Sequence, residues 1–196
     1  MRLPFVVVSL SLVFFLTGCG AYRGTPDPVV SKRDAEWMAK VAPGERDMIY
    51  ARYLINYKTD EQPGTIIVDT PKRFLYFVLP NGKAMRYGVA VGDEAYGWSG
   101  VAYIARKAEW PNWTPTAAMM QRWPHVRPTT GGPHNPLGAR ALYLYQGNRD
   151  TLYRIHGTND PSDIGQALSS GCIRMRNIDV IDLYNRASLN AKVIVR

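Results

Sequence analysis

From residue 65 onward, the chain consists of short apolar runs of strand length separated by turn residues. The first runs predict strands at 65–69, 73–79 and 85–91, and the Pro80-Asn81-Gly82 segment between the last two is typical of a β-hairpin. Further strands are expected at 101–105, 141–145, 152–155 and 192–195. The pattern predicts a mainly β fold, a mostly antiparallel sheet or barrel-like sandwich with a few short helices, from about residue 60 to the end.

Helices are expected outside these runs. Residues 31–60 are predicted to form an N-terminal helical arm, broken at Pro43-Gly44, because Ile49, Tyr53 and Tyr57 follow a helical spacing. Two short helices are predicted late in the chain, one at 161–168 and one that runs to residue 187 with Asn177 as its N-cap. Residues 110–138 hold three tryptophans among many prolines and glycines, which predicts a long structured loop of the kind used for function.

The N-terminus has the features of an export signal. A positive start, Met1-Arg2, precedes an apolar run that is too short to span a membrane. The run ends in Leu16-Thr17-Gly18-Cys19, which resembles the bacterial lipoprotein signal. That resemblance implies a signal peptide at 1–18, an acylated Cys19 and a linker at 19–30. The alternative is an ordinary secretory signal in which Cys19 has no role.

Cysteine count and charge narrow the function further. The chain has two cysteines, and an acylated Cys19 could not pair with Cys172. Cys172 is then a lone thiol with a function, an inert buried thiol, or the partner of Cys19 in a disulfide. The formal net charge of +8 suits an anionic wall polymer or lipid headgroups better than nucleic acid, because no contiguous Lys/Arg tract is present. A solvated basic surface explains the charge equally well.

The segment from 155 to 177 has the residues that a cysteine nucleophile requires. Such a nucleophile needs a nearby base, a group that orients the base, and donors for the oxyanion formed on attack. His156 ends a predicted strand, and Ser170-Gly171-Cys172 is predicted to form a tight turn before the next helix. The glycine allows backbone amides in the turn to point at a substrate oxygen.

This segment resembles the signature of the L,D-transpeptidase (YkuD-type) catalytic domain family. The matching residues are His156-Gly157-Thr158, Ser169, Gly171-Cys172-Ile173-Arg174-Met175 and Asn177. The chain departs from the family at Ser170, where histidine is commoner. The resemblance extends over the segment from Pro63 to Asp69 and the loop from Gly132 to Gly138, so it implies a catalytic domain at 61–196.

The resemblance also implies a role for each site residue. Cys172 would be the nucleophile and His156 its base, with the Gly157 carbonyl orienting the imidazole. Amides at Gly171 and Cys172 would form the oxyanion hole, and Ser170 would lend its backbone to the turn. Arg174 would shape the turn or bind a substrate carboxylate, and His134 would contact the substrate. From the chemistry we expect a charged His156 to lower the pKa of the Cys172 thiol.

The implied reaction is attack on the L-centre carbonyl of the third residue of a peptidoglycan stem tetrapeptide. D-Alanine leaves, and an amine then resolves the thioester. A second stem as acceptor gives a 3-3 crosslink, whereas a protein lysine gives an attached lipoprotein. No cofactor, metal or nucleic acid is expected, and the protein is expected in the periplasm, lipid-anchored to a bacterial membrane, with the outer membrane preferred.

Three alternatives remain open on the sequence. Water in place of the amine would make the protein an L,D-carboxypeptidase or endopeptidase. The chain could be an inactive, lipid-tethered wall-binding module, although an intact His156 and Cys172 argue against it. A zinc site formed by His134, His156 and Cys172 is disfavoured by the lack of paired metal-ligand spacing. His125 is assigned no role.

Overall fold

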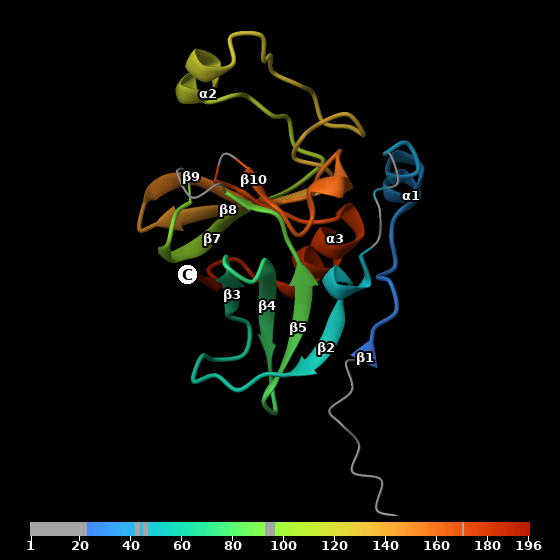
Figure 1. Ribbon diagram of the computed structural model, residues 1–196, viewed down its shortest axis with the longest axis vertical. Helices are drawn as coiled ribbons and strands as arrows, with labels where there is room; N and C mark the ends of the chain where they lie inside the picture. Colours follow the sequence, from blue (N-terminus) through green and yellow to red (C-terminus); the bar gives the residue numbers. More distant parts are fainter. Residues whose placement is uncertain (1–22, 42–43, 45–46, 93–96, 170) are drawn as a thin grey trace, which may run out of the picture.

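Strands make up most of the fold (Figure 1). The computed structural model describes residues 23–196 except 42–43, 45–46, 93–96 and 170. The strands are β1 (Arg23–Gly24), β2 (Tyr53–Asn56), β3 (Ile66–Asp69), β4 (Phe74–Leu79), β5 (Lys83–Gly88), β6 (Val91–Gly92), β7 (Gly100–Glu109), β8 (Arg140–Gln146), β9 (Arg149–His156), β10 (Ala167–Ser169), β11 (Ile173–Arg174) and β12 (Lys192–Val195). The helices are α1 (Lys32–Met38), α2 (Ala117–Arg122) and α3 (Asn177–Arg186), with short 3-10 turns η1 (Met48–Tyr50) and η2 (Pro161–Asp163).

One large sheet holds most of these strands, in the order β1-β2-β5-β4-β3-β12-β7-β8-β9-β11. β12 joins its two halves, because it pairs parallel with β3 and antiparallel with β7. β6 and β10 form a separate parallel pair. Figure 1 shows the β7–β9 group running across the β2–β5 group, with α3 beside both. The predicted mainly β fold with mostly antiparallel pairing is confirmed.

The main core lies between the two halves of the sheet and α3. Its buried side chains come from strands far apart in the sequence and from the apolar face of α3, and include Ile66, Leu75, Tyr87, Ile104, Leu142, Ile155 and Leu183. Every predicted strand has a counterpart, although the run at 85–91 is divided between β5 and β6. In the predicted hairpin, Asn81 and Gly82 have φ angles of 61° and 63°. Asn and Gly accept this conformation more readily than other residues.

The predicted helical arm at 31–60 is wrong over its second half. The described helix there is α1, which a Ser31–Asp34 capping box begins, and residues 53–56 form the strand β2 instead. β2 pairs with the otherwise free edge of β5, and Tyr57 stacks on Tyr76 of β4 at a centroid distance of 4.5 Å. The aromatic spacing therefore serves a strand, because tertiary pairing outweighs the local helical pattern.

Two buried ion networks fasten this arm to the sheet. Asp34 receives a bidentate pair from Arg140, with N–O distances of 2.9 and 2.7 Å, and the indole Nε1 of Trp110 at 2.7 Å. Arg52 contacts Asp179 at 3.3 Å and Asp182 at 3.9 Å, both on α3. The arm thus packs onto the start of the long loop, the start of β8 and α3.

The helix predicted at 161–168 is also wrong. The chain forms the 3-10 turn η2 and then β10, which pairs with β6. Gly165 has a φ angle of 95°, which a continuing right-handed helix does not allow. No helix in the described part of the chain is long and apolar enough to cross a membrane. Cys19 and the predicted signal peptide lie outside the described residues.

Candidate active site

Two parallel strands carry the predicted catalytic segment. β9 ends at His156, and β11 begins directly after Cys172. Their register pairs Ile155 with Ile173 and His156 with Arg174. Both isoleucines are buried in the core, and side chains alternate along a strand. His156 and Cys172 therefore share the opposite face on neighbouring strands, although 16 residues separate them in the sequence.

The Cys172 thiol lies against β9. Its Sγ is 3.9 Å from the carbonyl oxygen of Leu152, and the backbone amide of Arg154 is directed at it. The Cys172 residue keeps part of its surface exposed to solvent. The sulfur is thus placed by the backbone of β9.

The imidazole of His156 is buried, with 4% of the residue exposed. Its Nδ1 lies 2.6 Å from the carbonyl oxygen of Gly157. A carbonyl can only accept a hydrogen bond, so Nδ1 carries the hydrogen and Nε2 keeps its lone pair. This tautomer leaves Nε2 as the atom that can take a proton.

A buried asparagine holds the turn that follows His156. Asn177 Oδ1 accepts from the backbone amides of Ala139 (2.9 Å) and Thr158 (3.2 Å), and its Nδ2 donates to the Thr158 carbonyl (2.9 Å). A Cβ on Gly157 would overlap Asn177 Oδ1, so this turn requires glycine. The predicted N-cap role of Asn177 is wrong. Arg176 is the N-cap of α3, because the Asn177 amide is bound in the turn.

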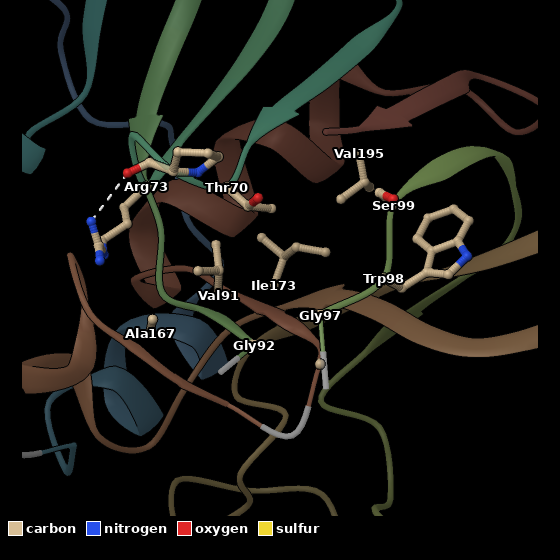
Figure 2. Close-up of a pocket in the computed structure, with 12 residues that line it drawn as sticks. Thr70, Arg73, Val91, Gly92, Gly97, Trp98, Ser99, Ala167, Ile173 and Val195 are labelled. Atoms are coloured by element: carbon tan, nitrogen blue, oxygen red, sulfur yellow. Dashed lines mark hydrogen bonds between the residues drawn. The ribbon is translucent and has the colours of Figure 1, made fainter. Parts of the chain in front are cut away.

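Glycines shape the turn before Cys172. Gly171 is buried and has a φ angle of 114°, a conformation that favours glycine. A Cβ on Gly92 would lie 2.8 Å from the Cα of Gly171, so β6 packs directly on this turn. A pocket of about 330 Å³ adjoins the same turn, and Figure 2 shows Val91 and Ile173 directed into it. Ser170, predicted for the oxyanion turn, lies outside the described residues.

Arg174 is engaged on both its backbone and its side chain. Its amide and carbonyl bond to Ala90, both at 2.9 Å, and its guanidinium forms an ion pair with Asp163 of η2. These contacts tie the cysteine turn to β6 and η2. They favour the turn-shaping role over carboxylate binding, because Asp163 already occupies the guanidinium.

The loop histidines lie apart from this pair. His134 is exposed, and its carbonyl accepts from Asn159 Nδ2 at 3.3 Å, which packs the loop on the segment after β9. His125 is exposed as well. Among the described residues, no three His, Cys, Asp or Glu side chains form a group that could hold a metal ion. His134 is therefore not gathered with His156 and Cys172 into the zinc site considered above.

The predicted long loop forms a cover over β9. Its two arms pair through Trp113 and Thr129, and α2 lies at its far end, above β9 in Figure 1. A second pocket, of about 230 Å³, lies between the two elements. Its lining comes from α2 and its flanks (Thr116, Ala118, Met119, Arg122, Trp123) and from β9 (Thr151, Leu152, Tyr153). Leu152 thus lines this pocket and also contacts the Cys172 thiol through its carbonyl.

Burial leaves the two reactive groups neutral at pH 7. Burial raises the pKa of the Cys172 thiol, although the Arg154 amide and the charges of Arg154 and Arg174 oppose this. Burial lowers the pKa of His156 to about 4, and the same two arginines lower it further. The expected thiolate–imidazolium pair is therefore wrong for the resting protein.

Sequence reasoning missed the part of the site that β7, β8 and β9 supply. Arg154 and Tyr143 are opposite each other in the β8–β9 register, and Arg154 lies near Cys172. No local motif marks these residues, because strand register alone brings Arg154 beside the thiol and Tyr143 opposite Arg154.

The amino-acid sequence is similar to a known protein family and to several of its members. A family model described as the L,D-transpeptidase catalytic domain, YkuD, matches residues 63–195. A putative L,D-transpeptidase of Fuscovulum blasticum is 35% identical over 133 residues, which cover 66% of this chain and 68% of that protein. The probable L,D-transpeptidase YbiS of Escherichia coli is 32% identical over 141 residues, covering 66% of this chain and 43% of that protein. The chain thus spans less than half the length of YbiS.

Solved structures agree on the fold. The Enterococcus faecium L,D-transpeptidase C442S mutant superposes with a TM-score of 0.54 at 16% identity, covering 69% of this chain and 50% of that one. A Brucella melitensis protein described as a probable carnitine operon oxidoreductase is 44% identical, with a TM-score of 0.52, covering 83% of this chain and 99% of that one. Its description concerns that protein alone. The match of the L,D-transpeptidase model to two thirds of the chain, together with the curated relatives, shows that the chain belongs to the YkuD family of L,D-transpeptidase catalytic domains.

Proposed function

We propose that the chain is a peptidoglycan L,D-transpeptidase in which Cys172 is the nucleophile and His156 its base. One observation carries the assignment within the family: the β9–β11 register, which puts Cys172 and His156 on one face. The hydrogen bond from His156 Nδ1 to Gly157 supports it, because it directs a basic Nε2 away from the backbone.

In the first half-reaction, the Cys172 sulfur attacks the L-centre carbonyl carbon of the third residue of a stem tetrapeptide. The thiol proton passes to Nε2 of His156 as the S–C bond forms. The C–N bond to the terminal D-alanine then breaks, and the imidazolium returns the proton to the leaving amine. His156 is unprotonated at pH 7 but is a weak base, so formation of the S–C bond has to drive the proton transfer.

The turn before Cys172 supplies the oxyanion stabilisation in this proposal. A positive φ at Gly171 turns the backbone sharply before the nucleophile, and the amides of Gly171 and Cys172 would donate to the tetrahedral oxygen. In the second half-reaction an amine attacks the thioester carbon and transfers its proton to His156. The C–S bond then breaks, and the imidazolium returns the proton to the sulfur, which regenerates the thiol. A second stem gives a crosslink, and a protein lysine gives an attached lipoprotein.

Mass spectrometry of the protein mixed with a stem tetrapeptide tests the proposal. The expected species is the protein plus the peptide less D-alanine, absent in Cys172→Ala and strongly reduced in His156→Ala. Muropeptide products then separate transfer from hydrolysis, because transfer gives a crosslinked product and hydrolysis a free tripeptide. Binding without any adduct or product would contradict the enzymatic function and leave a wall-binding module.

We also propose that Cys19 is the lipid attachment site and that the protein acts in the periplasm, anchored to the outer membrane. The apolar run before Leu16-Thr17-Gly18-Cys19 supports this placement. Fractionation of cells that express Cys19→Ser should move the protein from the membrane to the soluble fraction, while the acylation assay is unchanged. Retention of that variant in the membrane fraction would count against lipid anchoring at Cys19.

A further inference from the structure

A row of arginine and tyrosine side chains crosses the sheet and ends at the nucleophile. The β7–β8 register pairs Arg106 with Tyr143, and the β8–β9 register pairs Tyr143 with Arg154. The β9–β11 register continues the row, since Cys172 directly precedes the residue opposite Ile155. Paired residues on neighbouring strands face the same side of a sheet. Arg106, Tyr143, Arg154 and Cys172 therefore share the face that carries His156.

Both guanidinium groups of the row lie over one tyrosine ring. The central guanidinium carbon is 3.5 Å from the centroid of Tyr143 for Arg106 and 4.5 Å for Arg154. Tyr143 is itself buried, with 6% of the residue exposed. A ring held in this way fixes two flexible arginines in defined positions at the floor of the site.

The two arginines differ in their acidic partners. Arg154 forms a bidentate pair with Asp150, at 2.7 and 2.8 Å. In the described part of the chain, no carboxylate lies within ion-pair distance of Arg106, whose residue is exposed. Stacking on a ring leaves the N–H donors of a guanidinium at its edge, where they fit a planar carboxylate. Arg106 therefore has the charge and geometry to receive an anion, and the substrate face is where that anion would arrive.

We propose that Arg106, held on Tyr143 beside Arg154, binds a carboxylate of the acyl donor and so contributes to substrate specificity. The inference rests on the proposed function, because it takes a stem peptide as the donor. Neighbouring strands lie about 4.8 Å apart, so β7 is roughly 14 Å from the strand of Cys172. The Arg106 guanidinium itself lies over Tyr143 of β8, two strand spacings or about 10 Å from the strand of Cys172. With the carbonyl of the third residue at Cys172, the two preceding residues of an extended stem advance about 7 Å, and the reach of a donor carboxylate group covers the rest.

Donor binding to Cys172→Ala, measured by calorimetry, tests this contact without requiring turnover. Adding Arg106→Gln removes the charge and keeps a polar side chain of similar reach. We expect the Kd for the stem tetrapeptide to rise about tenfold or more, in line with the loss of a hydrogen-bonded charge pair. Arg149→Gln is the matched control, because Arg149 is an exposed arginine at the opposite end of β9. That control should leave Kd unchanged.

Amidation of the donor identifies the group that Arg106 binds. The tetrapeptide is prepared with its carboxylates converted to amides one at a time. For the amide at the contacted position, Arg106→Gln and its parent should have the same Kd, while the other amides keep the tenfold difference. An unchanged Kd for Arg106→Gln with the free acid, or a difference that persists with every amide, would overturn the inference. Failure of the proposed function gives a different result, namely no acyl adduct on the wild-type protein.

Discussion

The ionisation state of Cys172 is the property on which the proposed mechanism depends most directly. Burial raises the pKa of this thiol above its ordinary value of 9.0, and only the thiolate reacts rapidly with an alkylating agent. A thiol of this kind is ionised to about 1% or less at pH 7 and gains nearly tenfold per pH unit up to its pKa. The alkylation rate at pH 9 should therefore be about 50 times or more the rate at pH 7.

The assay is the initial rate of reaction with iodoacetamide from pH 5 to 10. The Cys19→Ser background makes Cys172 the one remaining cysteine, and Cys172→Ala gives the blank. His156→Gln should keep the same midpoint, because an imidazole with a pKa of about 4 carries no charge across this range. A rate that is already constant between pH 6 and 8, with a midpoint that rises in His156→Gln, would refute the neutral pair. It would instead establish a thiolate–imidazolium pair.

Three further predictions concern what holds the site together. The pKa of His156 is about 4 in the folded protein against 6.5 in the unfolded chain, so the unfolded chain binds more protons between these two pH values. The free energy of unfolding should therefore fall by roughly 3 kcal/mol as the pH drops from 6.5 to 4. Thermal melts across this range should show a smaller loss in His156→Gln. Asn177→Ala removes the hydrogen-bond partner of two buried backbone amides and one backbone carbonyl. Urea denaturation should show a loss of about 2 kcal/mol or more in the free energy of unfolding, and acylation should slow at least about tenfold. Unchanged values would mean that water replaces the Asn177 side-chain amide. Asp34→Ala removes the bidentate partner of the buried Arg140, which keeps the longer contact with Glu109 at 3.9 Å, and should cost about 3 kcal/mol by the same denaturation assay. Asp34→Leu with Arg140→Met should cost less, and a double variant as unstable as the single one would contradict this account of the ion pair.

Local patterns in the sequence were sufficient for most of the strands. Alternating apolar runs and the Asn81-Gly82 turn predict β3, β4, β5 and the hairpin between β4 and β5, because strand period and positive φ are properties of a few consecutive residues. The same holds for the catalytic segment. His156 at a strand end and Gly171 before Cys172 can be recognised because their chemistry and backbone requirements are local.

The arm and η2 show where local patterns fail. Ile49, Tyr53 and Tyr57 follow a helical spacing, yet residues 53–56 form β2 because the edge of β5 pairs with all four of them. Residues 167–169 form β10 because β6 lies alongside. In both cases a distant strand supplies the hydrogen bonds, so the pairing outweighs a propensity worth a fraction of a kcal/mol per residue.

The chemistry of the candidate site also depends partly on the sequence alone and partly on the tertiary structure. The sequence by itself determined which residue types are available, a thiol, an imidazole and a glycine turn, since these depend on residue identity alone. Only the tertiary structure decided their ionisation, because burial by distant strands raises the pKa of the Cys172 thiol and lowers the pKa of the His156 imidazole. It also decided that Asn177 holds the Gly157 turn and that Arg106 and Arg154 share one tyrosine ring, because these contacts join residues 11 to 37 positions apart through strand register and packing.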